Sequence, residues 1–222
     1  GAIFADLNIG IFFAIAVSSQ AVLPFLMGGY ASNSKYGMVG GMRTVAQMLA
    51  YEVPMVFALM GIIMITGSLK MSSIVEAQAN VWFVFLQPLA FLIFLVTALV
   101  ESNRPPFNIV EGESEIIAGP FTEYTGMRWA LFFLAEFANL LSISIMTTTL
   151  FLGGWHGPAF LPGMVWFWVK VLLMVLVFQW IGWTFPRFRI DQMLSFGWKV
   201  LLPVALVNVL LTGIGVYIYN WL

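Results

Sequence analysis

The hydrophobic residues of this chain fall into six long runs that short polar segments separate. The runs cover residues 8–28, 45–67, 81–101, 129–152, 164–184 and 200–220. Each is about as long as the roughly 20 residues that an α-helix needs to cross a hydrocarbon core. None shows the apolar/polar alternation of outer-membrane β-barrel strands. The pattern predicts an all-α integral membrane protein with about six transmembrane helices, in one transmembrane domain over residues 1–222.

The composition supports a membrane protein and excludes several kinds of site. Apolar residues make up 61% of the chain, charged residues only 9%, and the mean hydropathy is +0.97, whereas soluble domains have about 25% charged residues. The net charge of −1 gives no reason to expect a nucleic-acid partner. The absence of cysteine excludes disulfides, iron–sulfur ligation and thiolate zinc sites within these residues. The single histidine, His156, cannot form a His-rich metal site, so we expect no metal.

The basic residues are distributed unevenly between the two ends of the predicted helices. Seven of the nine lie on one side: Lys35, Arg43, Arg104, Arg128, Arg187, Arg189 and Lys199. Short loops on the cytoplasmic side of membrane proteins carry such an excess. We therefore expect that side to face the cytoplasm or matrix, with both termini on the outer side.

The connection between the third and fourth runs, residues 101–128, holds five of the ten acidic residues. It reaches a formal charge of −3 over 28 residues and lies on the predicted inner side. Two interpretations compete. A solvated loop needs no further account, whereas an acidic site at the membrane surface would bind a ligand or transfer protons.

Three carboxylates lie at or below the inner membrane boundary: Glu52, Glu101 and Glu136. Intramembrane carboxylates are costly and usually face a polar interior, where they mark ion or proton paths. Pro54 frees a backbone carbonyl close to Glu52, and that carbonyl needs a partner inside the protein. Asn139 shares a helical face with Glu136. The spacing favours a line of protonatable groups that leads inward, although a protonated structural glutamate is the alternative at each position.

Other charged residues have simpler interpretations. Lys170 lies near a predicted helix end, where a lysine can extend its ammonium group to the membrane surface. Arg187, Arg189 and Asp191 lie at the inner surface, either as anchors or as counter-charges for the acidic connection. No nucleotide-binding or nucleophile motif is present. We therefore expect these residues to bind no cofactor by themselves.

Several sequence blocks occur together in a recognisable order. They are ADLNIG, SNSKY, RxxAQMxxYEVP, ESNRPPFNxxEGESExxxGxxxEY, FFLAEFxN, TTTLFLGGW and PRxRxDQxxxxxWKxxLP. From Ala5 to about Pro203 the chain resembles the NADH dehydrogenase subunit 1 family of respiratory NADH:quinone oxidoreductase, complex I. Members of that family have eight transmembrane helices, and the six runs here resemble the last six. Asn108 departs from the aspartate of most relatives, so no aspartate role is transferred to it.

The resemblance implies a membrane-arm subunit that forms a chamber for the quinone substrate and the start of an acidic proton path. The implied chamber and loop residues are Arg43, Arg104, Glu111, Glu113, Glu115 and Glu123. The implied proton path contains Glu52, Glu101 and Glu136. The implied counter-charges of the loops are Arg187, Arg189 and Asp191.

The resemblance also implies the partners and the place of the chain. NADH, FMN and iron–sulfur clusters are expected in partner subunits, and the partners are other membrane-arm subunits and the peripheral arm next to the quinone. The implied place is a bacterial plasma membrane or a mitochondrial inner membrane, and we favour the bacterial one. Because Gly1 stands where a start methionine would be, we expect a processed or truncated N-terminus.

Three other functions remain open. The chain could belong to an energy-converting hydrogenase or to a ferredoxin- or deazaflavin-linked dehydrogenase with the same architecture. It could be a proton-coupled transporter, although no inverted repeat is visible. It could also be a passive anchor for a peripheral enzyme, which would leave Glu52 and Glu136 without a role.

Overall fold

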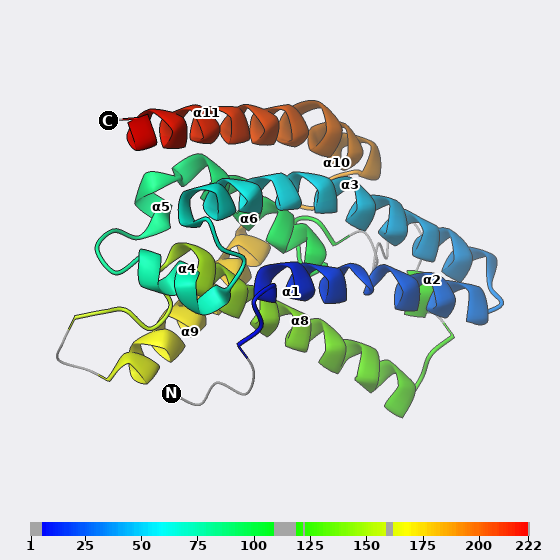
Figure 1. The fold of residues 1–222 in the computed structure, drawn as a ribbon. Helices are drawn as coiled ribbons and strands as arrows, with labels where there is room; N and C mark the ends of the chain where they lie inside the picture. Colours follow the sequence, from blue (N-terminus) through cyan, green and yellow to red (C-terminus); the bar gives the residue numbers. More distant parts are fainter. Residues whose placement is uncertain (1–5, 109–118, 122, 159–161, 222) are drawn as a thin grey trace.

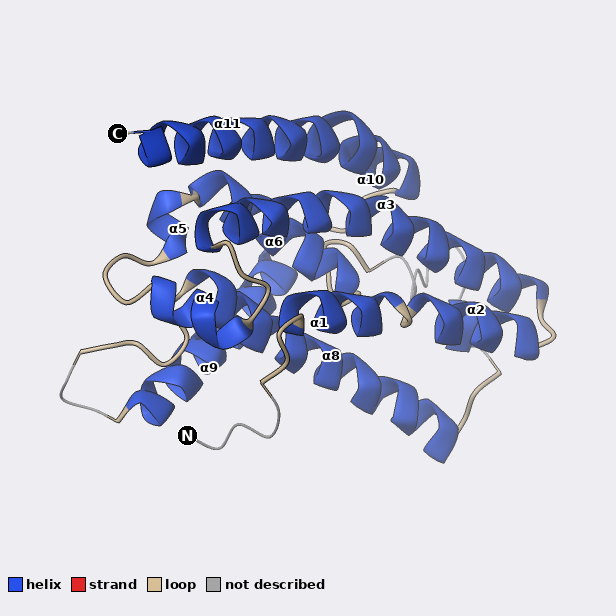
Figure 2. Ribbon diagram, in the orientation of Figure 1, coloured by secondary structure: helices blue, strands red, loops and turns tan. Residues whose placement is uncertain are grey.

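The computed structural model describes residues 6–108, 119–121, 123–158 and 162–221, which form helices and their connections without a strand (Figure 2). The helices are α1 (Gly10–Ser19), α2 (Val22–Ala31), α3 (Lys35–Thr66), α4 (Met71–Ala77), α5 (Phe83–Leu86), α6 (Pro88–Glu101), α8 (Met127–Phe151), α9 (Gly163–Thr184), α10 (Ile190–Phe196) and α11 (Leu202–Trp221). A 3₁₀ turn at Gly119–Phe121 precedes α8, and a π turn at Gly197–Leu201 joins α10 to α11.

Five helical stretches in the described ranges are long and apolar enough to cross a membrane. They are Gly10–Ala31, Lys35–Thr66, Met127–Phe151, Gly163–Thr184 and Ile190–Tyr219. The predicted all-helical membrane fold is thereby confirmed. The predicted second run began at residue 45, but α3 begins at Lys35 and therefore includes most of the first basic connection.

The third predicted run is divided between α5 and α6, and α6 is too short to be counted among the helices of membrane-spanning length. Pro88 is the first residue of α6, and Gln87 before it has a non-helical backbone with φ −133° and ψ 63°. A proline disfavours the helical conformation of the residue that precedes it, which accounts for the break. The 14 residues of α6 extend over roughly 21 Å, less than the ~30 Å hydrocarbon core.

The long helix α3 is the axis of the bundle. It packs against α2, α6 and α11, and Figure 1 shows it between α11 on one side and the α1–α2 pair on the other. Half of its apolar window is buried, compared with 6% for α1 and α2. Tyr51, Leu59 and Ile62 on α3 meet Phe94 of α6 in the core.

The basic segments gather at one end of the bundle. Figure 1 places α2, the starts of α3 and α8, and α10 at this end, whereas α4, α5 and the end of α11 lie at the other. The tertiary structure thus brings together the connections that the charge pattern assigned to one side. Which side faces the cytoplasm stays a prediction.

Lys170 is buried against the connection that follows α8. It is 7% exposed, and its ammonium group donates to the backbone carbonyl oxygens of Leu152 (2.6 Å), Gly154 (3.2 Å) and His156 (2.6 Å). It also lies 4.5 Å from the ring centre of Trp82. The carbonyls that follow α8 lack helical partners and a buried ammonium needs acceptors, so each satisfies the other. These contacts give Lys170 a structural role at the end of α8, in agreement with its structural interpretation.

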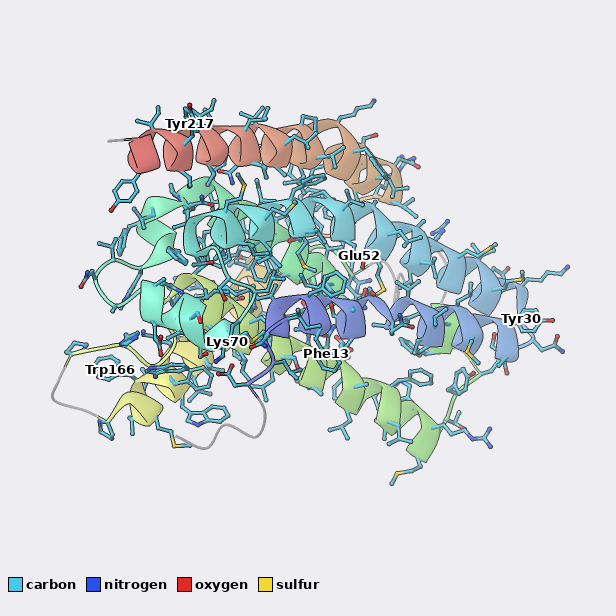
Figure 3. All side chains as sticks on the ribbon, in the orientation of Figure 1. Phe13, Tyr30, Glu52, Lys70, Trp166 and Tyr217 are labelled. Atoms are coloured by element: carbon cyan, nitrogen blue, oxygen red, sulfur yellow. The ribbon has the colours of Figure 1, made fainter. Side chains whose placement is uncertain are left out.

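A salt bridge between Asp6 and Lys70 ties the segment before α1 to the connection between α3 and α4. The Asp6 carboxylate accepts hydrogen bonds from Lys70 Nζ at 2.8 Å and from the Ser72 hydroxyl at 2.9 Å. The hydrogen bond from Lys70 and, less strongly, that from Ser72 hold the pKa of Asp6 below its ordinary value, and the same pairing raises the pKa of Lys70. Figure 3 shows Lys70 close to the start of α1.

Replacing Gly29 by alanine should destabilise the packing of α2 on α3. An added Cβ would lie 2.7 Å from the carbonyl oxygen of Gly37 and 3.2 Å from Cα of Gly41, so the two helices must move apart, at a cost of about 1–3 kcal/mol. The matched control is Gly215→Ala on α11, where nothing lies within 4 Å of the added atom. Thermal unfolding of both variants in detergent measures the difference. Equal midpoints for the two variants would contradict the close α2–α3 contact.

Asp6→Asn should lower the thermal unfolding midpoint at pH 7, and this difference should disappear in acid. A carboxylate whose folded pKa is depressed stabilises above its unfolded pKa of about 3.9, and this effect is lost as the pH falls through the folded pKa. The lysine partner acts in the opposite sense and loses its contribution above its unfolded pKa of about 10.4. The control is Asp191→Asn, whose local pair with Arg189 is more than 70% exposed on both side chains. A pH-independent difference for Asp6→Asn would rule out the charge pairing as its cause.

Candidate functional site

The polar segment that follows α6, residues 101–108, enters the bundle as a non-helical chain. Gln47 of α3 donates its amide hydrogens to the carbonyl oxygens of Phe107 (2.9 Å) and Val100 (3.4 Å). From the other side, Asn139 of α8 donates to the carbonyl oxygen of Glu101 at 2.9 Å. Backbone carbonyls among membrane helices need partners inside the protein. These two amide side chains therefore fix the segment between α3 and α8.

Two local features set the path of this segment. Asn103 has φ +51°, in the left-handed region, which asparagine adopts more readily than most residues. The peptide bond between Pro105 and Pro106 is cis. Asn103 is 6% exposed, and within the described ranges its carbonyl oxygen Oδ1 has no hydrogen-bond donor.

The resulting path brings Arg104 to α8. Its Nε lies 3.2 Å from Oε1 of Glu136, and its guanidinium carbon lies 4.3 Å from the ring centre of Phe137. Both charged side chains are largely buried, at 16% and 21% exposure. A partly buried carboxylate beside a guanidinium is far less costly than one alone. Glu136, the acidic residue inside the fourth predicted run, thus pairs with Arg104 from the connection that precedes this run.

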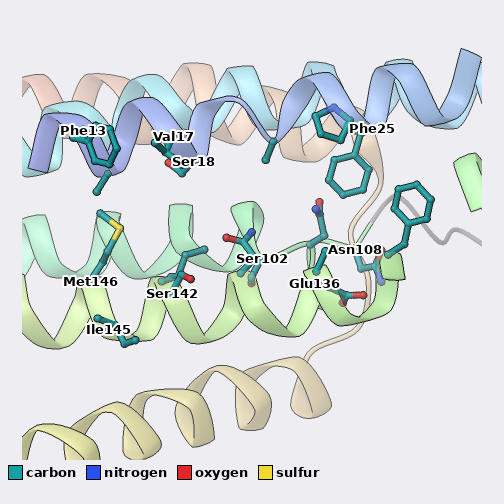
Figure 4. A pocket seen from close by; sticks show the side chains of 18 of the residues that line it. Phe13, Val17, Ser18, Phe25, Ser102, Asn108, Glu136, Ser142, Ile145 and Met146 are labelled. Atoms are coloured by element: carbon teal, nitrogen blue, oxygen red, sulfur yellow. The ribbon is translucent and has the colours of Figure 1, made fainter. Parts of the chain in front are cut away.

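A cavity of about 600 Å³ lies between α1, α2, α8 and this segment, and we call it the large cavity. Its apolar wall includes Phe13, Val17, Phe25, Phe121, Phe132, Ile145 and Met146, and its polar wall consists of Ser18, Ser102, Asn103, Asn108, Glu136, Asn139 and Ser142. Figure 4 shows Phe13, Val17 and Ser18 on α1 opposite Ser142 and Met146 on α8. Three aromatic rings, Phe25, Phe121 and Phe132, are in consecutive contact, with ring centres 6.2 and 5.0 Å apart.

A second, much smaller cavity of about 20 Å³ lies between α1, α3 and α6, and we call it the small cavity. Its walls include Glu52, Glu101, Ser18 and Ser19. Figure 3 shows Glu52 between α3 and the α1–α2 pair. All four side chains surround this small space, so the Ser18 hydroxyl lies beside Glu101, the Ser19 hydroxyl lies beside Glu52, and the two carboxyl groups interact electrostatically. The volume suffices for about one water molecule.

The structure thus brings some of the expected site residues together and leaves others apart. Arg104 and Glu136 form a pair at the large cavity, while Glu52 and Glu101 share the small one. Glu136, which the family resemblance assigned to the proton path, therefore lies at the wall of the large cavity. Glu111, Glu113 and Glu115 lie outside the described residues.

The remaining expected residues do not line either cavity. Glu123 is exposed on the connection before α8, and Arg43 is partly buried on α3. Arg187, Arg189 and Asp191 are exposed, and Arg189 pairs with Asp191 at 3.0 Å. Whether these residues act as counter-charges for the acidic connection stays a prediction, since Glu111, Glu113 and Glu115 lie outside the described residues.

Sequence reasoning missed the two serines and the aromatic residues of the cavity walls. Ser18 and Ser19 are adjacent hydroxyl residues inside an otherwise apolar run, and that interruption is a signal that the sequence does contain. The aromatic wall gives no such signal, because 21 phenylalanines are spread over the chain. Only the tertiary structure selects the ones that meet.

Comparison with known proteins gives a consistent answer. A family model described as NADH dehydrogenase matches residues 1–213. Proteins named as subunits of NADH-quinone oxidoreductase from Carboxydothermus hydrogenoformans and Dehalococcoides mccartyi are 51% and 52% identical over 218 and 213 residues. These alignments cover 97% and 96% of this chain but 62% and 60% of the relatives, so the chain spans about three fifths of their length. A third relative, the same subunit from Anoxybacillus flavithermus, is 50% identical over 214 residues, which are 95% of this chain and 64% of the relative. The chain belongs to the NADH dehydrogenase family.

Proposed function

We propose that this chain forms the quinone-binding part of a proton-translocating NADH:quinone oxidoreductase and that the large cavity is its quinone chamber. The observation that carries the proposal is the composition of that cavity. Its volume of about 600 Å³ lies within the roughly 300–1,000 Å³ of small-molecule sites, which are mostly apolar with a few convergent polar groups. The relatives are named as subunits of NADH-quinone oxidoreductase, and these names support the same substrate.

The walls of the cavity suit the two parts of a quinone. The aromatic rings of Phe25, Phe121 and Phe132 offer faces and edges for a planar ring. The amide groups of Asn108 and Asn139 lie on the polar wall, where an amide N–H can donate to a quinone carbonyl oxygen. At the α1 side, Phe13 and Val17 are 54% and 56% exposed. This apolar side provides an entry for a hydrophobic tail from the bilayer.

The charged groups supply what quinone reduction demands of this subunit. Adding two electrons to a quinone creates a demand for two protons, and the electrons come from partner subunits that carry NADH, FMN and iron–sulfur chemistry. Glu136, with Arg104 beside it, lies at the cavity wall. Glu52 and Glu101 lie one helix away. Charge that develops in the chamber acts on these carboxyl groups, which titrate as a coupled set.

The proposal includes the surroundings of the chain. The five apolar helical stretches place it in a bilayer, and its bacterial relatives favour a bacterial plasma membrane. The basic end of the bundle, which carries residues 101–128, would face the cytoplasm and contact the peripheral arm. Glu111, Glu113, Glu115 and Glu123 would border the chamber there, with Arg43, Arg187 and Arg189 near the same surface.

Photo-crosslinking of an azido-quinone to the assembled complex tests the chamber directly. We expect labelled peptides from residues 13–25, 101–108 and 132–146, and excess quinone should compete the label away. Peptides from α9 serve as an internal control and should stay unlabelled, since this helix contributes no residue to the large cavity. Labelling that is confined to partner subunits would overturn the chamber and leave the chain as an anchor or a proton-path component.

Glu136→Gln should slow quinone reduction by about tenfold or more, the lower range for loss of a proton-transferring group. The variant keeps the side-chain size but removes the charge that faces Arg104, so we expect the complex to assemble. The matched control is Glu76→Gln on α4, an exposed glutamate far from both cavities. Steady-state rates and proton uptake by proteoliposomes measure the effect. Normal turnover with normal pumping in Glu136→Gln would remove this residue from the mechanism.

A further inference from the structure

Two neighbouring serines end α1 at the point where it breaks from α2. The Ser18 hydroxyl lies 2.9 Å from the carbonyl oxygen of Ile15, and the Ser19 hydroxyl lies 3.0 Å from that of Ala16. Serine hydroxyls in apolar helices commonly bond to the preceding turn and bend the helix there. Pro24, in the first turn of α2, cannot donate a hydrogen bond to the Gln20 carbonyl, which stops α1 from continuing into α2. The two serines add to this break through their bonds to the preceding turn.

A role in breaking the helix does not explain why the same two hydroxyls lie beside carboxyl groups. Ser18 and Ser19 line the small cavity together with Glu101 and Glu52, so that the Ser18 hydroxyl lies beside the Glu101 carboxyl group and the Ser19 hydroxyl beside that of Glu52. Each serine thus stands between a backbone carbonyl and a carboxyl group. Because a hydroxyl has one proton and two lone pairs, it can donate to only one of these two acceptors at a time. Rotation about the Cβ–Oγ axis moves that proton from one acceptor to the other.

Ser18 also occupies a position that none of the other described residues shares. It lines both the large cavity and the small cavity, whereas the remaining described wall residues belong to one or the other. Figure 4 shows its side chain on α1, on the side that faces the large cavity. Protons that move between the two cavities need a polar group in the apolar layer between them, and Ser18 lies in that layer.

We propose that the Ser18 hydroxyl passes protons between the large cavity and the Glu101–Glu52 pair, with Ser19 as the hydroxyl that serves Glu52. This inference rests on the function proposed above and adds the residue that connects the quinone chamber to the carboxyl pair. Neither serine belongs to the acidic residues from which the path was first constructed.

The proton transfer balances without any change of electrons. A hydronium ion in the large cavity gives a proton to a lone pair of Ser18 Oγ and becomes water. At the same time the original O–H bond of Ser18 breaks and its proton passes to the Glu101 carboxylate, which becomes a carboxylic acid. Rotation of the new O–H bond from the large cavity to the Glu101 side restores the orientation of the hydroxyl, and Glu101 regains its charge when its proton passes on to Glu52. The same exchange in reverse returns a proton to the chamber.

Ser18→Ala in the assembled complex should lower the rate of quinone reduction and of coupled proton pumping by about tenfold, at the low end for loss of a proton-transfer group. The KM for quinone should stay unchanged, because alanine leaves the chamber wall intact. The solvent deuterium isotope effect on kcat should rise, since proton delivery becomes rate-limiting. The control is Ser144→Ala on α8, which removes a similar hydroxyl–carbonyl bond of 2.8 Å at a fully buried residue that lines neither cavity.

A second pair of variants separates proton transfer from packing. Ser18→Thr and Ser18→Val introduce side chains of nearly the same shape, but only threonine has a hydroxyl. We expect threonine to keep most of the rate and valine to lose it as alanine does. A Ser18→Ala enzyme with the same rates as Ser144→Ala would overturn the proposal. Equal rates for Ser18→Thr and Ser18→Val would also overturn it, and this comparison remains valid if the Ser18→Ala complex does not assemble.

The azido-quinone experiment distinguishes this failure from failure of the proposed function. If quinone labels the large cavity and the Ser18 variants turn over and pump normally, the chamber stands and the serine relay is wrong. If quinone does not label this chain in the unmodified complex, the chamber is wrong. In that case the relay in the form proposed here is wrong as well.

Discussion

The structure depends on the need to pair backbone polar groups where a non-helical segment runs among apolar helices. Residues 101–108 form such a segment, and Gln47 and Asn139 hold it through hydrogen bonds to its carbonyl oxygens. Unpaired carbonyls in this environment would each cost several kcal/mol. Because the segment is held at both ends, Arg104 reaches Glu136 and the polar wall of the large cavity forms.

The same constraint accounts for features that lie far from the site. Lys170 pairs with the carbonyls that follow α8, so its charge stabilises a connection and contributes nothing to the cavities. α3 combines two roles, because one stretch of it supplies the core residue Tyr51 and, one residue later, Glu52 at the small cavity. Because Tyr51 is packed in the core, the backbone that carries Glu52 is held in place at the small cavity.

Much of the fold followed from the hydrophobic pattern, and the family followed from the ordered blocks of sequence. Five of the six predicted runs correspond to helices of membrane-spanning length, while the third is divided because Pro88 stops helix formation at Gln87. The carboxylates Glu52, Glu101 and Glu136 were found as isolated acidic residues in apolar runs. Their division into two groups was not predictable, since it depends on how α1, α6 and α8 pack. The sides of the membrane and the roles of the site residues remain predictions.

The sequence by itself determined that the chain is a helical membrane protein, which family it belongs to, and which few charged residues lie among its apolar helices. These properties are encoded locally, in hydrophobic runs, in the spacing of charged residues and in short sequence blocks, all of which can be interpreted without knowing the tertiary contacts. Only the tertiary structure decided that Arg104 pairs with Glu136, that four phenylalanine rings line one cavity, and that Ser18 borders two cavities. Each of these depends on residues far apart in the chain, and their distances are set by helix packing and by the anchored path of residues 101–108.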